Sequence, residues 1–91
     1  MTKALALDYA KDGVRVNCIC PAGVMTPLLE DWISKQPDPT ATIQALEEMH
    51  PLGRCATTEE VAQAVLYLAT DSSVFITGVA LPVDGGASLG Y

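Results

Sequence analysis

The residues of this 91-residue chain whose types and spacing best suit chemistry form a short loop, residues 21–26, between a predicted strand and a predicted helix. In an open parallel sheet, ligands bind beyond the carboxyl ends of the strands. A helix that begins at Thr26 would direct free N–H groups and the positive end of its dipole toward that position, which favours a phosphate group. Gly23 would let the backbone approach a ligand closely, and the Thr26 hydroxyl could bond either the ligand or its own helix. An ordinary strand-to-helix turn capped by Thr26 would have the same sequence.

The remaining reactive side chains favour structural roles. His50, the single histidine, precedes a proline at a predicted helix end, and we expect a loop residue there rather than a catalytic base. Cys18 and Cys20 share a strand face with no histidine or further cysteine nearby, so we expect buried small residues rather than metal ligands. Cys55 lies just before a helix start, a position that can activate a thiol, but a structural role is favoured. Three cysteines, an odd count, predict reduced thiols in a cytoplasmic protein.

Hydrophobic spacing predicts helices that surround two strands, and therefore an α/β fold. The predicted helices cover residues 1–11, 27–35, 39–49 and 58–70, and the predicted strands cover residues 14–20 and 79–83. Two strands joined through helices are expected to be parallel. Pro82 should place the second strand at a sheet edge, because proline has no N–H to donate. Such a sheet cannot bury both of its faces, so the sequence predicts two parallel strands plus helices that are incomplete on their own.

Capping residues mark where these helices begin and end. Thr26-Pro27 and Asp38-Pro39 each combine an N-cap with a proline at the first helical position, where its missing N–H costs nothing. Thr57 and Glu60 have the spacing of a capping box. Gly13 follows the first helix as a C-terminal stop.

Composition and charge exclude several classes of function. The chain is 49% hydrophobic and 18% charged, as globular proteins are. Its net charge is -6 and its five basic residues are scattered, so we expect no nucleic-acid partner. No stretch has the length and apolarity of a membrane span, and the first ten residues lack the order of a signal peptide.

Several segments, in order, resemble the short-chain dehydrogenases/reductases. They are Val14-Arg15-Val16-Asn17-Cys18-Ile19-Cys20-Pro21, Gly23-Val24-Met25-Thr26, Pro51-Leu52-Gly53-Arg54, Glu59-Glu60-Val61-Ala62 with Leu68-Ala69, Phe75-Ile76-Thr77-Gly78 and Val83-Asp84-Gly85-Gly86. The resemblance implies a partial Rossmann-type, doubly wound parallel sheet, with residues 1–91 as the C-terminal part of a single domain. Residues 37–43 and 85–91 look like the branch that contains L-fucose and hydroxysteroid dehydrogenases. The implied reaction is hydride transfer between NAD or NADP and a secondary alcohol or ketone.

The same resemblance implies a role for each residue of the loop. Pro21 would abut the nicotinamide ring, the Val24 backbone would bond its carboxamide, and Thr26 would reach the carboxamide or the pyrophosphate. Gly23 and Ala22 complete this cofactor-binding set. Ala22 departs from the family, which more often has glycine there, and its methyl group is expected to shift the loop slightly.

An apolar set of side chains falls where the family binds its substrate. Its members are Met25, Leu28, Leu29, Trp32 and Met49. They are candidates for a wall of the substrate site, and plain core packing is the alternative.

Two motifs of the family are absent from the chain. The catalytic Tyr-x-x-x-Lys is missing, because Tyr9 is followed four residues on by Gly13 and Tyr67 by Asp71, and the Gly-rich first turn is missing as well. We therefore expect no catalytic residue here, and a chain that is inactive alone. Family members are commonly homotetramers, so a homo-oligomer is expected. The alternatives are a non-catalytic module that docks onto a full-length subunit, and the product of a disrupted gene.

Overall fold

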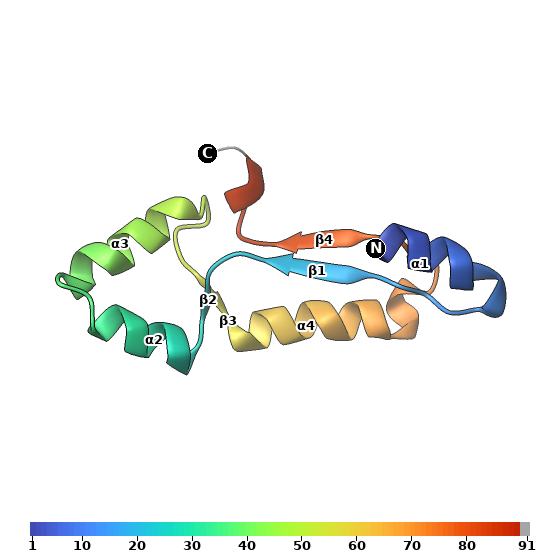
Figure 1. The fold of residues 1–91 in the computed structure, drawn as a ribbon, viewed down its shortest axis with the longest axis horizontal. Coiled ribbons are helices and arrows are strands. Elements are labelled where there is room, and N and C mark those ends of the chain that lie inside the picture. Colours follow the sequence, from blue (N-terminus) through green and yellow to red (C-terminus); the bar gives the residue numbers. More distant parts are fainter. Residues whose placement is uncertain (90–91) are drawn as a thin grey trace.

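Two parallel strands form the centre of the computed structural model, which describes residues 1–89 (Figure 1). Strand β1 (Cys18–Pro21) pairs with β4 (Ala80–Val83), and the register places Cys18 opposite Ala80 and Pro21 opposite Val83. The parallel pairing confirms the predicted fold class. Gly90 and Tyr91, the end of the segment compared with the fucose and hydroxysteroid branch, lie outside the described residues.

Four α-helices flank this sheet in the described part of the chain. They are α1 (Thr2–Tyr9), α2 (Pro27–Ser34), α3 (Pro39–Met49) and α4 (Thr58–Ala69). Helix α4 lies along the sheet, whereas α2 and α3 lie beyond the carboxyl ends of its strands (Figure 1). Three short 3-10 helices complete the regular structure, at Ala10–Asp12, Asp71–Ser73 and Ala87–Leu89.

The predicted helix caps are all confirmed. The Thr26 hydroxyl accepts the Leu29 N–H, and the Asp38 carboxylate accepts the Ala41 N–H. Thr57 and Glu60 form the reciprocal capping box at the start of α4. Gly13 ends the first helical segment with a φ of 73°, a left-handed conformation that favours glycine.

Strand β1 is shorter than predicted, because the segment before it is held by side chains instead of a ladder. The Val16 N–H donates to the Thr77 hydroxyl, and the Val16 carbonyl accepts the Gly78 N–H. The Asn17 side-chain amide donates to the Ile76 carbonyl and accepts the Val79 N–H. Residues 14–17 therefore run beside residues 76–79 without regular pairing.

A second pairing was missed by the sequence analysis. Strand β2 (Val24–Met25) lies parallel to β3 (Ala56–Thr57), with Val24 opposite Ala56. Each strand has two residues, which is too short for a period-2 pattern to be recognised. The pairing joins the loop after β1 to the segment that leads into α4.

The described residues bury little apolar surface. The hydrophobic residues that are buried are Ala6, Ile33 and Cys55, whereas Phe75 is fully exposed and Leu28 is 80% exposed. The radius of gyration is 16.3 Å and the longest extent is 53 Å, against about 12 Å expected for the radius of gyration of a compact domain of this length. The expectation that these residues are incomplete on their own agrees with this shape.

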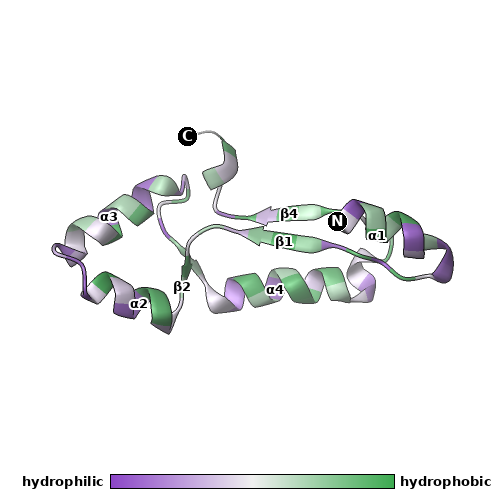
Figure 2. Cartoon of the chain, in the orientation of Figure 1, coloured by the Kyte–Doolittle hydropathy of each residue, from purple (hydrophilic) through white to green (hydrophobic). Residues whose placement is uncertain are grey.

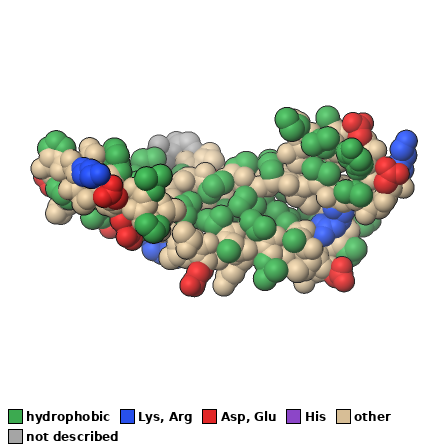
Figure 3. All heavy atoms as spheres, turned by 60° about the horizontal axis from the view of Figure 1, so that its bottom comes forward, with side chains coloured by type: hydrophobic (Ala, Val, Ile, Leu, Met, Phe, Trp, Pro, Cys, Tyr) green, Lys and Arg blue, Asp and Glu red, His purple; other side chains and the backbone are tan. Residues whose placement is uncertain are grey.

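Apolar residues are concentrated in the two longer strands and in α4. Apolar residues (green) run along both longer strands and recur along α4, while the turns after α1 and between α2 and α3 are polar (Figure 2). In the space-filling view, hydrophobic side chains gather over the middle of the visible face (Figure 3). In β4 the pattern alternates, with Leu81 and Val83 half-buried and Ala80 and Pro82 exposed.

Candidate cofactor-binding site

The loop of residues 21–26 lies where β1 ends and α2 begins. Pro21 is the last residue of β1, Val24 and Met25 form β2, and Thr26 caps α2. Pro21 and Ala22 are exposed, whereas residues 23–26 are half-buried. The loop is therefore at the carboxyl end of a parallel strand, with its first residues open to a ligand.

Gly23 is fixed through both of its backbone groups. Its N–H donates to His50 Nε2 at 3.1 Å, and its carbonyl accepts the Ala56 N–H at 2.9 Å. A Cβ atom at this position would lie 2.8 Å from His50 Cε1 and 2.9 Å from Cys55 Sγ. Glycine is therefore required at this position because side chains of the protein itself, rather than a ligand, approach the backbone closely.

Thr26 uses its hydroxyl oxygen to cap its own helix. Thr26 Oγ1 accepts the Leu29 N–H at 3.1 Å, and the Thr26 carbonyl accepts the Glu30 N–H at 2.9 Å. Pro27, the first residue of α2, has no N–H, and Glu30 adds a negative charge to the first turn. These features make the helix start a weaker phosphate site than the sequence alone indicates. The Thr26 hydroxyl proton can still be donated to a neutral acceptor such as a carboxamide oxygen.

Three of the five candidate substrate residues lie on α2, on two different faces of that helix. Leu29 is half-buried on the face that includes the buried Ile33, as a packing residue would be. Leu28 and Trp32, one turn apart, are 80% and 51% exposed. Met25 is half-buried in β2 and Met49 is 56% exposed at the end of α3. Leu28, Trp32 and Met49 thus have surface available for a ligand or a partner.

His50 has a role that the sequence analysis did not find. It is only 2% exposed, whereas the sequence analysis expected no more than a loop residue. Its Nδ1 lies 2.7 Å from the Leu46 carbonyl, and its Nε2 accepts from Gly23. The only signal in the sequence was a histidine before a proline, which does not reveal a contact 27 residues away.

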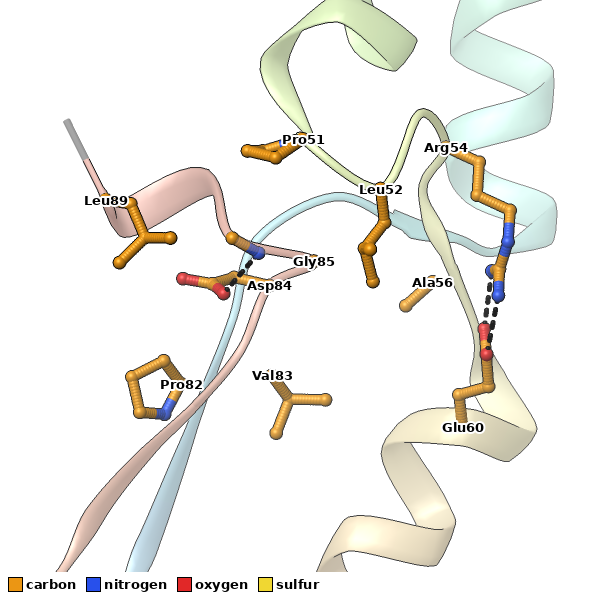
Figure 4. Close-up of a pocket in the computed structure, with 11 residues that line it drawn as sticks. Pro51, Leu52, Arg54, Ala56, Glu60, Pro82, Val83, Asp84, Gly85 and Leu89 are labelled. Carbon is orange, nitrogen blue, oxygen red and sulfur yellow. Dashed lines mark hydrogen bonds and ion pairs between the residues drawn. The ribbon is translucent and has the colours of Figure 1, made fainter. Parts of the chain in front are cut away.

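A cavity of about 480 Å³ lies beside this loop, between the end of β4 and the connector to α4 (Figure 4). Its walls are largely apolar, with Leu52, Pro82 and Val83 among them. The polar groups around it already have partners, because Arg54 and Glu60 form an ion pair and Asp84 accepts the Gly86 N–H. None of the loop residues 21–26 lines this cavity, so it adds no reactive group to the candidate site.

Three ionisable groups near the loop have shifted pKa values. Hydrogen bonds from Ser88 and Gly86 hold the pKa of the Asp84 carboxyl below its usual range. Burial and the nearby Glu47 raise the pKa of the Cys55 thiol, and partial desolvation and Cys18 raise that of Cys20. A thiol with a raised pKa is a poor nucleophile near neutral pH. The expectation that Cys18 and Cys20 are both buried is wrong, because Cys18 is half-buried and Cys20 is exposed at the end of β1.

Residues 1–89 contain neither a candidate metal cluster nor a helix that could span a membrane. No cluster of three histidine, cysteine, aspartate or glutamate side chains there could hold a metal ion. No helix in that range has the length and apolarity needed to cross a membrane.

The chain is similar to dehydrogenases over its whole length. A family model described as Enoyl-(Acyl carrier protein) reductase matches residues 1–88. L-fucose dehydrogenase of Bos taurus is 53% identical over 91 residues, which are 100% of this chain and 33% of the bovine protein. The chain spans about a third of the length of the curated relatives that it matches.

Solved structures agree with this likeness. The crystal structure of a short chain dehydrogenase family protein from Francisella tularensis has a TM-score of 0.89 and 39% identity, covering 98% of this chain and 39% of that one. ElxO with NADP bound has a TM-score of 0.84 and 30% identity, covering 94% of this chain and 34% of that one. The parallel pairing of β1 with β4, the loop after β1 and these likenesses lead to one conclusion: the chain belongs to the short-chain dehydrogenase/reductase family and forms part of its Rossmann fold.

Proposed function

We propose that this chain supplies the nicotinamide-side part of an NAD(P)-dependent oxidoreductase. The observation that carries the proposal is the loop of residues 21–26, which stands at the carboxyl end of β1 and is fixed at Gly23 and through the pairing of β2 with β3. A cofactor that must present one face of its ring to a substrate needs such a rigid support. The NADP-bound relative supports a nicotinamide cofactor, which would donate or accept the hydride when bound.

The loop residues would bind and orient the nicotinamide end of NAD or NADP. The exposed Pro21 would pack against the ring, and the Val24 backbone would bond the carboxamide. The Thr26 hydroxyl oxygen accepts the Leu29 N–H, and its proton could be donated to the carboxamide oxygen or to the pyrophosphate. Ala22, exposed like Pro21, would border the ring.

The substrate would lie beside α2 and α3. Leu28, Trp32 and Met49 present exposed apolar surface there, and the half-buried Met25 lies nearer to the loop. An apolar wall of this kind suits a small secondary alcohol or ketone. Leu29 would support this wall from the packed face of α2.

Residues 1–91 would be the C-terminal part of one Rossmann domain, and the rest of the domain would cover the exposed apolar face. Because the chain has no Tyr-x-x-x-Lys, the proton-transfer residues would come from the remaining part, and the chain alone would be inactive. The assembled enzyme would be a cytoplasmic homo-oligomer, a tetramer or a dimer, with reduced thiols and with α1, α4 and β4 near its interfaces.

The second candidate is a non-catalytic module that docks onto a complete subunit. Exposed side chains such as Phe75, Leu7 and Leu66 favour it, because they need a covering surface. This module would bind a relative without adding activity.

One exchange experiment tests the proposed function. Residues 1–91 replace the matching third of bovine L-fucose dehydrogenase, and the chimera is assayed for L-fucose-dependent reduction of NAD or NADP at 340 nm. We expect activity within about tenfold of the host, and none from the 91-residue chain alone. A chimera that folds and assembles like the host but binds neither cofactor would overturn the proposal. Activation or inhibition of the intact host by the added chain would instead favour the docking module.

A further inference from the structure

His50 joins the substrate side of the candidate site to its cofactor side. Its backbone lies at the C-terminal end of α3, and Nδ1 lies 2.7 Å from the Leu46 carbonyl of that helix. Its Nε2 lies 3.1 Å from the backbone nitrogen of Gly23 in the loop. One buried imidazole therefore bonds to both segments.

The two contacts define the protonation state of the ring. The backbone N–H of Gly23 can only donate, so Nε2 must accept and carry no proton. The Leu46 carbonyl can only accept, so Nδ1 must carry the proton. The ring is thus a neutral imidazole in the Nδ1–H form, and both of its nitrogen atoms are satisfied. A residue with this arrangement holds a backbone in place and has no free nitrogen for acid–base work.

Further contacts surround Gly23. The space for a Cβ atom is already occupied by His50 Cε1 and Cys55 Sγ, at 2.8 and 2.9 Å. The Gly23 carbonyl is bonded to Ala56, opposite β2. His50 therefore holds the peptide that joins Ala22 to Gly23, and Ala56 holds the next peptide, which joins Gly23 to Val24, whose backbone is the proposed carboxamide contact.

We propose that His50 is a positioning residue that orients the cofactor loop, by bonding the Gly23 N–H, and couples that loop to α3. The inference rests on the proposed function, because it assigns the loop of residues 21–26 to the nicotinamide end of the cofactor. It predicts that loss of the bond to Gly23 weakens cofactor use specifically, while loss of the bond to Leu46 does not.

Two amide substitutions in the chimera separate these bonds. In H50Q the longer side chain can place an oxygen near the former Nε2 and accept the Gly23 N–H. In H50N the amide reaches only the former Nδ1 position, so it can donate to Leu46 but leaves the Gly23 N–H without a partner. An unsatisfied, partly buried N–H would displace the loop, and we expect H50N to raise the KM for the cofactor roughly tenfold. H50Q should remain within about twofold, and the KM for L-fucose should change little in either variant.

The matched pair distinguishes positioning from general stability. Two similar amides would lower the melting temperature by similar amounts, so rescue of the cofactor KM by H50Q alone supports positioning. Equal cofactor KM values in H50N, H50Q and the unsubstituted chimera would overturn the inference and leave the proposed function standing. Failure of the unsubstituted chimera to bind a cofactor would overturn both.

A spectroscopic measurement on the 91-residue chain tests the bond without activity. Nitrogen-15 NMR should detect scalar coupling across the hydrogen bond between Gly23 N and His50 Nε2, and an unprotonated Nε2. A protonated Nε2 in a chain with a dispersed spectrum would contradict the inference. If the chain alone gives no dispersed spectrum, the kinetic comparison of H50N with H50Q decides.

Discussion

Arg54 and Glu60 form a bidentate ion pair at the start of α4, with Nη1–Oε1 and Nη2–Oε2 distances of 2.7 and 2.8 Å (Figure 4). The same carboxylate accepts the Thr57 N–H as part of the capping box. One glutamate therefore caps the helix and fixes the connector that carries His50 and Cys55. The ion pair is exposed to solvent, so we expect it to contribute little to the free energy of unfolding. Its main effect would be to order the connector before α4.

The pKa of Glu60 gives a first prediction. The hydrogen bond from Arg54, followed by that from Thr57, lowers the Glu60 pKa from 4.5 to about 2. A lowered folded-state pKa contributes stability above about pH 4.5, and this contribution is lost as the pH falls toward 2. Carboxyl carbon NMR of the chimera should show the low Glu60 midpoint. In R54M the Glu60 midpoint should rise toward 4.5 without reaching it, because Thr57 still donates. An unchanged midpoint in R54M would exclude the ion pair as the main cause.

The tight packing around Gly23 gives a second prediction. In G23A the new methyl group would meet His50 Cε1 and Cys55 Sγ at 2.8 and 2.9 Å, and both of these residues are buried. We expect the chimera to lose about 1–3 kcal/mol of unfolding free energy, together with a higher KM for the cofactor. Thermal and urea unfolding measure the first effect and initial rates the second. K11R, at an exposed position outside the loop, is the control and should be neutral. A neutral G23A would show that the loop is not held here.

Arg15 gives a third prediction, at the other end of the sheet. Its guanidinium donates to the Ser73 hydroxyl and to the carbonyls of Ile76 and Thr70. The single ammonium nitrogen of R15K cannot reproduce the planar geometry in which Nη1 and Nη2 reach these three acceptors, and we expect it to lower the unfolding free energy of the chimera by about 1–3 kcal/mol. Cofactor KM should not change, since this cluster precedes the first residues of β1 and β4, whereas the loop follows the last residue of β1. The exposed K11R substitution serves as the control. Equal stability of R15K and K11R would contradict the assigned role.

The cysteines give a fourth prediction. Cys20 is exposed, whereas Cys55 is 8% exposed and its thiol pKa is raised by burial and by Glu47. In the native 91-residue chain, iodoacetamide at pH 8 should label Cys20 well before Cys55. E47Q removes one cause of the raised pKa and should speed labelling of Cys55 slightly. Mass spectrometry of tryptic peptides measures both rates, and preferential labelling of Cys55 would refute the buried thiol.

Local signals predicted much of this fold. Thr26-Pro27, Asp38-Pro39 and the Thr57–Glu60 box determine caps through residues three positions apart, so the helix starts followed directly from the sequence. The parallel pairing of β1 with β4 followed from chain order and connection rules. Residues 14–17 were assigned to the strand because Val14 and Val16 alternate, but the side chains of Asn17 and Thr77 replace the ladder there.

Contacts between distant segments could not be predicted. The bond between His50 and Gly23 joins residues 27 positions apart, and no periodicity encodes it. The pairing of Val24 with Ala56 is equally remote and involves two-residue strands. The sequence indicated where the candidate loop lies, but not that the connector of residues 50–56 holds it.

The position of a bound cofactor tests the central claim most directly. A crystal structure of the chimera with NADH should show the nicotinamide ring against Pro21 and its carboxamide bonded to the Val24 backbone, with His50 still bonded to Gly23. A well-defined nicotinamide bound away from residues 21–26 would contradict the account.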